Sequence, residues 1–263
     1  MSKIVDTKEK MYHIGLSAED IKHAKYVILP GDPGRVNKIA QAFGEYTELN
    51  FNREYKSALV KVGDEYALIC STGMGGPSVG IGIEELAMIG LEKFIRVGTT
   101  GTIQERINIG DMIVNNASVR LEGTSTHYAP LEYPAVADLN LTYALKKLAS
   151  DKNIPCHVGV GVSSDSFWPG QERYGNFSGY VLNRFKGSID EWRHLNVLNF
   201  EMESATLFTL VSVFGLQAAS ICLTVAKRTE SETVLDKAKW PDIETRLYGF
   251  VAEFVHYCVQ NKI

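Results

Sequence analysis

Short apolar runs alternate with amphipathic segments along most of this chain. Residues 25–31, KYVILPG, form an apolar run that ends at a glycine, and residues 33–44, PGRVNKIAQAFG, follow with helical spacing of their apolar positions. Proline near the start and glycine at the end are typical of helix boundaries. The pattern therefore predicts a strand, a short loop and a helix near the beginning of the chain.

The same alternation continues toward the C-terminus. Residues 57–73 predict two strands around a Gly-Asp turn, and residues 77–90 predict a helix that starts at proline and stops at glycine. Residues 93–101, KFIRVGTTG, predict a strand that is buried on both faces. The other predicted elements are helices near 138–151, 203–214 and 241–260 and strands near 156–162 and 217–225.

Apolar strands that alternate with helices favour a mainly parallel sheet covered on both faces. No linker-like segment or internal repeat interrupts the pattern. We therefore expect a single α/β domain across residues 1–263, with a central mixed, mainly parallel sheet flanked by helices on both faces.

Composition narrows the class of protein. The 263 residues are 45% hydrophobic and 22% charged, which suits a globular chain with a large core. The formal net charge of -4 and the lack of a basic tail argue against a protein that binds nucleic acid through its phosphate backbone. The longest apolar stretch, residues 205–226, contains Gly215 and Gln217, so we expect a helix followed by a strand and no membrane segment.

Two features bear on the cellular compartment. The N-terminal segment MSKIVDTKEKMYHIGL carries charges where a secretory signal needs an apolar core, so no export signal is expected. The four cysteines lie far apart in apolar surroundings and form no CxxC pair; they are Cys70, Cys156, Cys222 and Cys258. Buried free thiols are favoured over a disulfide or a metal site, and the expected location is the reducing cytoplasm.

Three glycine-containing loops follow predicted strands and carry anion-binding chemistry. They contain PGDPGR at 30–35, STGMGGPS at 71–78 and RVGTTG at 96–101. Glycine lets the backbone approach an anion, a helix N-terminus favours negative charge, and arginine matches phosphate oxygens. Because ligands collect at the carboxyl ends of parallel strands, the loops together predict an oxyanion site. Each loop alone also fits a tight turn with a solvated arginine, and no Walker A motif is present.

Two further segments carry polar groups that a small ligand would need. In NFEMESATLF, residues 199–208, two glutamates flank a methionine at the start of an apolar helix. One carboxylate is suited to vicinal sugar hydroxyls, and stabilisation of the helix dipole is the other explanation. In DSFWPGQERYG, residues 165–175, Gln171 and Arg173 lie on the same side if the segment is extended. Such a pair is suited to a flat ligand with polar edge atoms.

Six segments, taken in order, resemble the nucleoside phosphorylase superfamily and, within it, the bacterial uridine phosphorylases. They are PGDPGRV, CSTGMGGPS, RVGTTG, HVGVGVSSDSFWPGQERY, NFEMESATL and AKRTESE, between about Tyr12 and about Glu232. The resemblance implies a pentosyltransferase that cleaves uridine reversibly with inorganic phosphate, giving uracil and ribose 1-phosphate, with no further cofactor required. It also implies a homo-oligomer, a hexamer of three dimers, in which each dimer shares its active sites.

The resemblance assigns roles to the matched positions. The implied phosphate-binding residues are Gly31, Arg35, Arg96 and Thr99, together with Arg53 of a neighbouring subunit. The implied ribose-binding residues are Met202 and Glu203, with Glu201 beside them and His13 of the neighbour. The implied uracil-binding residues are Phe167, Gln171, Arg173 and Arg228. Positions that hold a monovalent cation such as K⁺ between subunits of related enzymes correspond to Glu54, Met74 and Ser78.

Alternatives to uridine phosphorolysis stay open at this point. Lys227 stands where uridine enzymes of the family carry asparagine, which leaves the preference between uracil and thymine undecided. A purine nucleoside phosphorylase would carry an acid there to protonate the purine. A nucleoside hydrolase on the same scaffold would use water and would not need several arginines at an anion site. A non-catalytic nucleoside-binding protein would need the base loop but no phosphate site.

Overall fold

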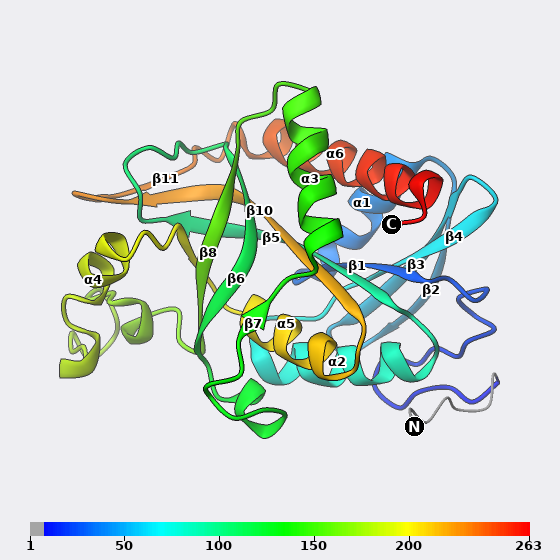
Figure 1. The fold of residues 1–263 in the computed structure, drawn as a ribbon, viewed down its shortest axis with the longest axis horizontal. Coiled ribbons are helices and arrows are strands. Elements are labelled where there is room, and N and C mark those ends of the chain that lie inside the picture. The colour runs from blue at the N-terminus through cyan, green and yellow to red at the C-terminus, as the bar shows by residue number, and fades with distance from the viewer. Residues whose placement is uncertain (1–7) are drawn as a thin grey trace.

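The computed structural model describes residues 8–263, and this part of the chain forms an eleven-stranded sheet with helices around it (Figure 1). The strands are β1 (Tyr26–Pro30), β2 (Tyr46–Asn52), β3 (Tyr55–Val62), β4 (Glu65–Cys70), β5 (Lys93–Thr102), β6 (Met112–Leu121), β7 (Ala135–Val136), β8 (Cys156–Ser164), β9 (Asn199–Glu201), β10 (Gln217–Arg228) and β11 (Glu232–Val234). The helices are α1 (Val36–Phe43), α2 (Gly76–Met88), α3 (Leu139–Asp151), α4 (Ser188–His194), α5 (Ser204–Val213) and α6 (Trp240–Asn261). The expectation that no export signal is present rests in part on residues 1–7, which lie outside the described residues.

The sheet is mixed, as predicted. Its strand order is β11-β10-β6-β8-β9-β5-β1-β4-β3-β2, and β7 pairs with β6. β1 runs parallel to β4 and β5, and β5 runs parallel to β10, so the centre has the parallel arrangement that the alternation of strands and helices predicted. The β2–β3–β4 meander and the pairs β5–β9, β6–β10, β6–β7 and β10–β11 are antiparallel.

A second pairing of β10 closes part of the sheet into a ring. β10 pairs with β5 and with β6, and the pairs β6–β8, β8–β9 and β9–β5 complete the circuit. Inside the ring, Asn115 Nδ2 of β6 donates to Asn199 Oδ1 of β9 at 2.7 Å. Since β6 and β9 are not neighbouring strands, this bond crosses the interior. The ring holds the very short strand β9 beside β5, which carries Arg96.

Helices cover both faces of the sheet, which confirms the expected layering (Figure 1). α1, α3 and α6 pack on one face around a buried cluster that includes Ile28, Leu145 and Phe254. α2 and α5 pack on the other face around a cluster that includes Ile83 and Phe208. Removal of these apolar side chains from water is the main stabilisation of the layers.

Local chemistry explains where elements begin and end. The predicted helix at 33–44 starts as a 3₁₀ turn, in which the Asp32 carboxylate accepts the Gly34 N–H at 2.8 Å, and becomes α-helical at Val36. The apolar stretch 205–226 divides at Gly215, whose φ is +72°, into α5 and β10 as predicted. Within residues 8–263, no helix is both long and apolar enough to cross a membrane.

Candidate active site

A cavity of about 370 Å³ lies at the carboxyl ends of β1 and β5, beside β9 and the start of α5. This volume is within the range of ordinary small-molecule sites. The predicted residues that line it are Gly31, Arg35, Met74, Arg96, Thr99, Phe167, Gln171, Arg173, Glu201, Met202 and Glu203. Segments that are far apart in the sequence therefore meet around one space, as the position of the loops after the strands predicted.

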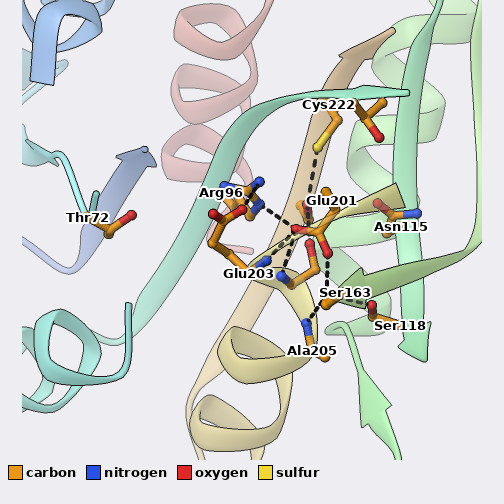
Figure 2. Close-up of polar contacts among 12 residues, drawn as sticks. Thr72, Arg96, Asn115, Ser118, Ser163, Glu201, Glu203, Ala205 and Cys222 are labelled. Carbon is orange, nitrogen blue, oxygen red and sulfur yellow. Dashed lines mark hydrogen bonds and ion pairs between the residues drawn. The ribbon is translucent and has the colours of Figure 1, made fainter. Parts of the chain in front are cut away.

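Arg96 is the buried cation at the centre of this site (Figure 2). Its Nε donates to Glu201 at 3.0 Å, and its Nη2 pairs with Glu203. Burial alone would lower the pKa of the Arg96 guanidinium, but Glu203 and Glu201 raise it above its ordinary value. Arg96 is thus a permanent positive charge whose orientation is set from two sides by carboxylates.

Glu201 is occupied by groups of the protein. Its Oε2 accepts the backbone N–H groups of Glu203 at 2.9 Å and Ser204 at 2.8 Å, in addition to Arg96, and its Oε1 accepts the Ser163 hydroxyl. Glu201 therefore caps the first turn of α5, as the helix-dipole explanation predicted, and it orients Arg96. The sequence grouped Glu201 with the ribose-binding residues, and Glu201 does line the cavity, with both of its carboxylate oxygens bonded to groups of the protein.

Glu203 has a different environment from Glu201. It precedes Ser204, the first residue of α5, but makes no capping bond to that helix. Its Oε1 accepts the Gly75 N–H at 2.8 Å, which ties it to the start of α2. Burial raises the pKa of the Glu203 carboxyl above its ordinary value, and Glu201 adds to this while Arg96 opposes it. Met202, which lies between the two glutamates, is half-buried and also lines the cavity.

The predicted phosphate end brings Gly31, Arg35, Arg96 and Thr99 around the same cavity. Gly31 directly follows β1, and a Cβ atom added there would lie 3.0 Å from the Gly73 carbonyl oxygen, so the two glycine loops pack closely. Arg35 Nε is 3.1 Å from Glu244 Oε1 on α6. Two arginines, each paired with carboxylates, and two glycine loops together supply hydrogen-bond donors that suit an oxyanion.

The segment 165–175, called the base loop here because it carries the residues predicted to bind uracil, contains a turn at its centre. This corrects the expectation of an extended segment. Pro169–Gln171 form a 3₁₀ turn, and Glu172 follows in the left-handed conformation with φ of +53°. The fold of this turn, and not strand alternation, brings the head groups of Gln171 and Arg173 together. Arg173 Nη1 donates to Gln171 Oε1 at 2.6 Å, and both side chains are buried.

Arg173 is held by three further groups, the first of which is the Phe167 carbonyl oxygen, which accepts from Nη1 at 2.9 Å. Its guanidinium lies 3.9 Å from the centre of the Phe167 ring, a cation–π contact. Its Nη2 donates to Glu232 at 2.9 Å. The aromatic, amide and guanidinium groups predicted for uracil therefore lie together at one end of the cavity.

Arg228 supports the base loop through a hydrogen bond to its backbone. Its Nη2 donates to the Gln171 carbonyl oxygen at 2.7 Å, and Arg228 lines a neighbouring hollow rather than the cavity itself. Burial, followed by repulsion from Arg173, lowers the pKa of Arg228 to about 10. Its buried Nη1 has no hydrogen-bond partner within residues 8–263.

Besides Arg228, four more predicted residues do not line the cavity of their own chain. His13 Nδ1 is 2.6 Å from Glu85, and Arg53 is exposed, 6.0 Å from the centre of the Tyr12 ring. Ser78 Oγ donates to Glu54 Oε1 at 2.6 Å, which is the main cause of the lowered pKa of Glu54. No cluster of three or more His, Cys, Asp or Glu side chains suited to a metal ion is found within residues 8–263.

The cavity also contains residues that the sequence reasoning did not assign. Glu232 and Val234 belong to β11, and Trp240 is the first residue of α6. Glu232 is the last residue of the AKRTESE motif, and Val234 and Trp240 follow that motif in a stretch with no clear apolar period. Lys227, in contrast, is directed to another part of the molecule, because its Nζ donates to the Glu105 carbonyl oxygen at 2.6 Å and it does not line the cavity.

Comparisons with known proteins agree with this geometry. The model of the Phosphorylase superfamily matches residues 25–256. The chain is 47% identical over 226 residues to a uridine phosphorylase of Salmonella typhimurium, with 86% of this chain and 89% of the relative covered. It is 48% identical over 227 residues to a uridine phosphorylase of Thermococcus kodakarensis, covering 86% of this chain and 81% of the relative.

A relative named for a different nucleoside is more distant. A guanosine phosphorylase of Halorubrum lacusprofundi is 38% identical over 213 residues, with 81% of this chain and 82% of the relative covered. The resemblance carried by the six sequence segments is confirmed, since both the family match and the uridine phosphorylase relatives cover most of the chain. This protein belongs to the phosphorylase superfamily.

Proposed function

We propose that this protein is a uridine phosphorylase, which converts uridine and inorganic phosphate into uracil and ribose 1-phosphate. The observation that carries the proposal is one cavity lined by the arginines Arg35 and Arg96, by the amide–guanidinium pair Gln171 and Arg173, and by Glu203, which pairs with Arg96. The relatives named uridine phosphorylase support the choice of a pyrimidine nucleoside. No protein nucleophile is needed, because phosphate itself attacks.

Arg35 and Arg96 orient the phosphate in this mechanism. A phosphate oxygen forms the new bond to C1′ of the ribose as the C1′–N1 bond breaks, and the electron pair of that bond leaves with the uracil. A positioned phosphate avoids much of the entropic cost of a bimolecular step. Because Glu201 bonds the Nε of Arg96, the guanidinium stays in a fixed orientation while its charge attracts the anion.

Glu203 and Met202 hold the ribose between the two ends. The Glu203 carboxylate accepts hydrogen bonds from the 2′- and 3′-hydroxyls, and Met202 packs against the apolar face of the sugar. Arg96, which pairs with Glu203, links the sugar site to the phosphate site. The Glu203 carboxylate therefore contacts the ribose directly and the phosphate site through Arg96.

Gln171 and Arg173 recognise the uracil and stabilise the negative charge that develops on it. The amide accepts from N3–H and donates to a carbonyl, and the guanidinium donates to O4, while Phe167 packs on the ring. Loss of one such donor commonly lowers the rate by about 100-fold. Arg228 acts behind this pair, through the Gln171 carbonyl that it bonds.

A dimer with shared sites completes the proposal. His13 and Arg53 are separated from the cavity of their own chain, and Tyr12 lies close to both. We infer that a second copy places its His13 at the ribose 5′-hydroxyl and its Arg53 at the phosphate. The assembly is a hexamer of three such dimers. Glu54, Ser78 and the backbone near Met74 hold a monovalent cation at the subunit boundary.

The expected location is the cytoplasm. The four cysteines are free thiols; Cys70, Cys222 and Cys258 are buried as predicted, whereas Cys156 is only partly buried. Burial raises the pKa of Cys70 to about 12, which keeps its thiol protonated and unreactive. A protein of this kind keeps its free thiols most readily in a reducing compartment.

The deciding experiment measures uracil release from uridine with and without inorganic phosphate, with inosine and guanosine as parallel substrates. Phosphate-dependent uracil release, with both purine nucleosides inert, is expected. Uracil release that does not need phosphate would instead identify a hydrolase. Cleavage of the purine nucleosides at a comparable rate would show that Gln171 and Arg173 do not select a pyrimidine.

A further inference from the structure

Glu172 stands between the two residues assigned to uracil, and its backbone has a positive φ of +53°. The Glu172 N–H donates to the Pro169 carbonyl at 3.1 Å, and the Arg173 N–H donates to the Trp168 carbonyl at 2.9 Å. These two bonds have the spacing of a Schellman motif, in which glycine is the usual residue at the left-handed position. A glutamate here strains the backbone, so a contact of its side chain must compensate.

The compensating contact is made by the carboxylate. Glu172 Oε1 accepts the Gly187 N–H at 2.5 Å, and Oε2 accepts the Ile189 N–H at 2.9 Å and lies 3.4 Å from the Ser188 hydroxyl. These donors belong to the first turn of α4, whose N–H groups have no partner within the helix. Glu172 thus fastens the base loop to α4 although it does not line the cavity.

α4 is in turn attached to the body of the protein near the site. Arg193 Nε donates to the Ile103 carbonyl oxygen at 2.9 Å, directly after β5. A continuous series of contacts therefore runs from β5, through α4 and the Glu172 carboxylate, to the turn that carries Gln171 and Arg173. The bond of 2.6 Å between Arg173 Nη1 and Gln171 Oε1 depends on the geometry of this turn.

We propose that Glu172 is a positioning residue for base recognition: its carboxylate anchors the base loop to α4 and so sets the placement of Gln171 and Arg173. The inference rests on the proposed function, because it assumes that these two side chains bind the base. Glu172 itself touches no substrate, and its effect acts through its two neighbours in the chain.

The kinetic test uses the variants Glu172→Ala, Glu172→Gly and Glu172→Gln, with Glu191→Ala as the matched control. Glu191 is an exposed glutamate of α4. Displacement of recognition groups by about 1 Å costs up to roughly 100-fold, so kcat/KM for uridine should fall about 10- to 100-fold in the alanine variant. The KM for phosphate should stay within about twofold of the wild type, since Arg35 and Arg96 are not held by α4.

The glycine and glutamine variants separate backbone strain from the carboxylate. Glu172→Gly removes the strain but also the anchor, so its uridine defect should resemble that of alanine. Glu172→Gln keeps one acceptor oxygen and should show a smaller defect. A glycine variant with wild-type kcat/KM for uridine, or an equal loss of the uridine and phosphate parameters, would overturn the inference.

Hydrogen–deuterium exchange provides a readout that does not depend on the reaction. In Glu172→Ala, the Ile189 amide and the peptide 166–175 should exchange faster than in the wild type and in Glu191→Ala. Unchanged exchange would refute the anchor. A wild-type enzyme that releases no uracil would overturn the proposed function instead, and the exchange result would still decide whether Glu172 anchors the loop.

Discussion

Replacement of Arg96 by alanine tests the charge arrangement at the centre of the site. Arg96 pairs with Glu201 at 3.0 Å and with Glu203, and all three residues are buried. Removal of one partner from a buried ion pair costs about 3–5 kcal/mol, because the remaining charge is left without compensation. Total stability is about 5–15 kcal/mol for a native protein, so a large share would be lost. The corresponding fall in Tm is about 6 to 20 °C.

The size of this loss should depend on pH. Burial raises the pKa of Glu203, and Arg96 is the main group that opposes the rise. In Arg96→Ala the folded-state pKa therefore moves further above the unfolded value of about 4.3. A carboxyl whose pKa is raised on folding stabilises the fold when it is protonated, and this contribution disappears as the pH rises through the folded pKa. The stability difference between wild type and variant should thus be largest at neutral pH and shrink as the pH is lowered toward the unfolded value of about 4.3.

Denaturant unfolding at several pH values measures this difference directly. The double variant Arg96→Ala/Glu203→Gln should recover part of the lost free energy of unfolding at neutral pH, since it no longer buries the Glu203 carboxylate without a partner. Arg246→Ala removes an exposed arginine of α6 and should change stability by less than about 0.5 kcal/mol. A difference that is constant across this pH range, or a double variant no more stable than the single one, would refute the reasoning.

Three further outcomes follow from the proposed site. Arg173→Ala should lower kcat/KM for uridine by about 100-fold while the KM for phosphate changes little, and Arg35→Ala should chiefly raise the KM for phosphate. Steady-state kinetics with each substrate varied in turn would measure both parameters. Equal effects of the two variants on both substrates would show that the two ends of the cavity are misassigned. Arg53→Ala and Arg173→Ala should each be nearly inactive. When subunits of the two variants are unfolded and refolded together, up to about a quarter of wild-type activity should return, because a mixed dimer contains one intact site. No recovery in a sample that contains mixed dimers would contradict active sites shared between subunits. Lys227→Asn should leave the ratio of uridine to thymidine turnover nearly unchanged, since Lys227 bonds the Glu105 carbonyl away from the cavity; a large change in that ratio would show that Lys227 reaches the base.

The local spacing of apolar and polar residues was sufficient to predict most of the helices and the strands at the parallel centre of the sheet. The segment 93–101 is apolar along its length, as a strand buried on both faces must be, and β5 occupies it. α2 begins beside Pro77, and glycine follows α2 at Gly90, where sequence boundaries were expected. The closed ring was not predicted, and neither were the helix α4 and the strands β2, β6, β7, β9 and β11. Strand pairing depends on partners far away in the chain, about which the local alternation of residues carries no information.

The candidate site, too, was predicted from the sequence only in part. The glycine and arginine content of the loop after β1 and of RVGTTG was enough to predict an arginine-lined end, although the structure places RVGTTG inside β5 and not in a loop after it. The sequence could not distinguish Glu201 from Glu203, since both precede α5. Only the fold shows that Glu201 accepts the N–H groups of that helix, whereas Glu203 reaches Gly75.

The sequence by itself determined the residue types, the layered α/β class and the family, since each follows from apolar spacing or from motifs contained in short segments. The tertiary structure decided how those residues act. The base loop is a strained turn because Glu172 meets the start of α4, and His13 and Arg53 lie outside the cavity of their own chain. These features arise from contacts between segments distant in the chain, and the free energy of such contacts overrides the local preference that a sequence pattern reports.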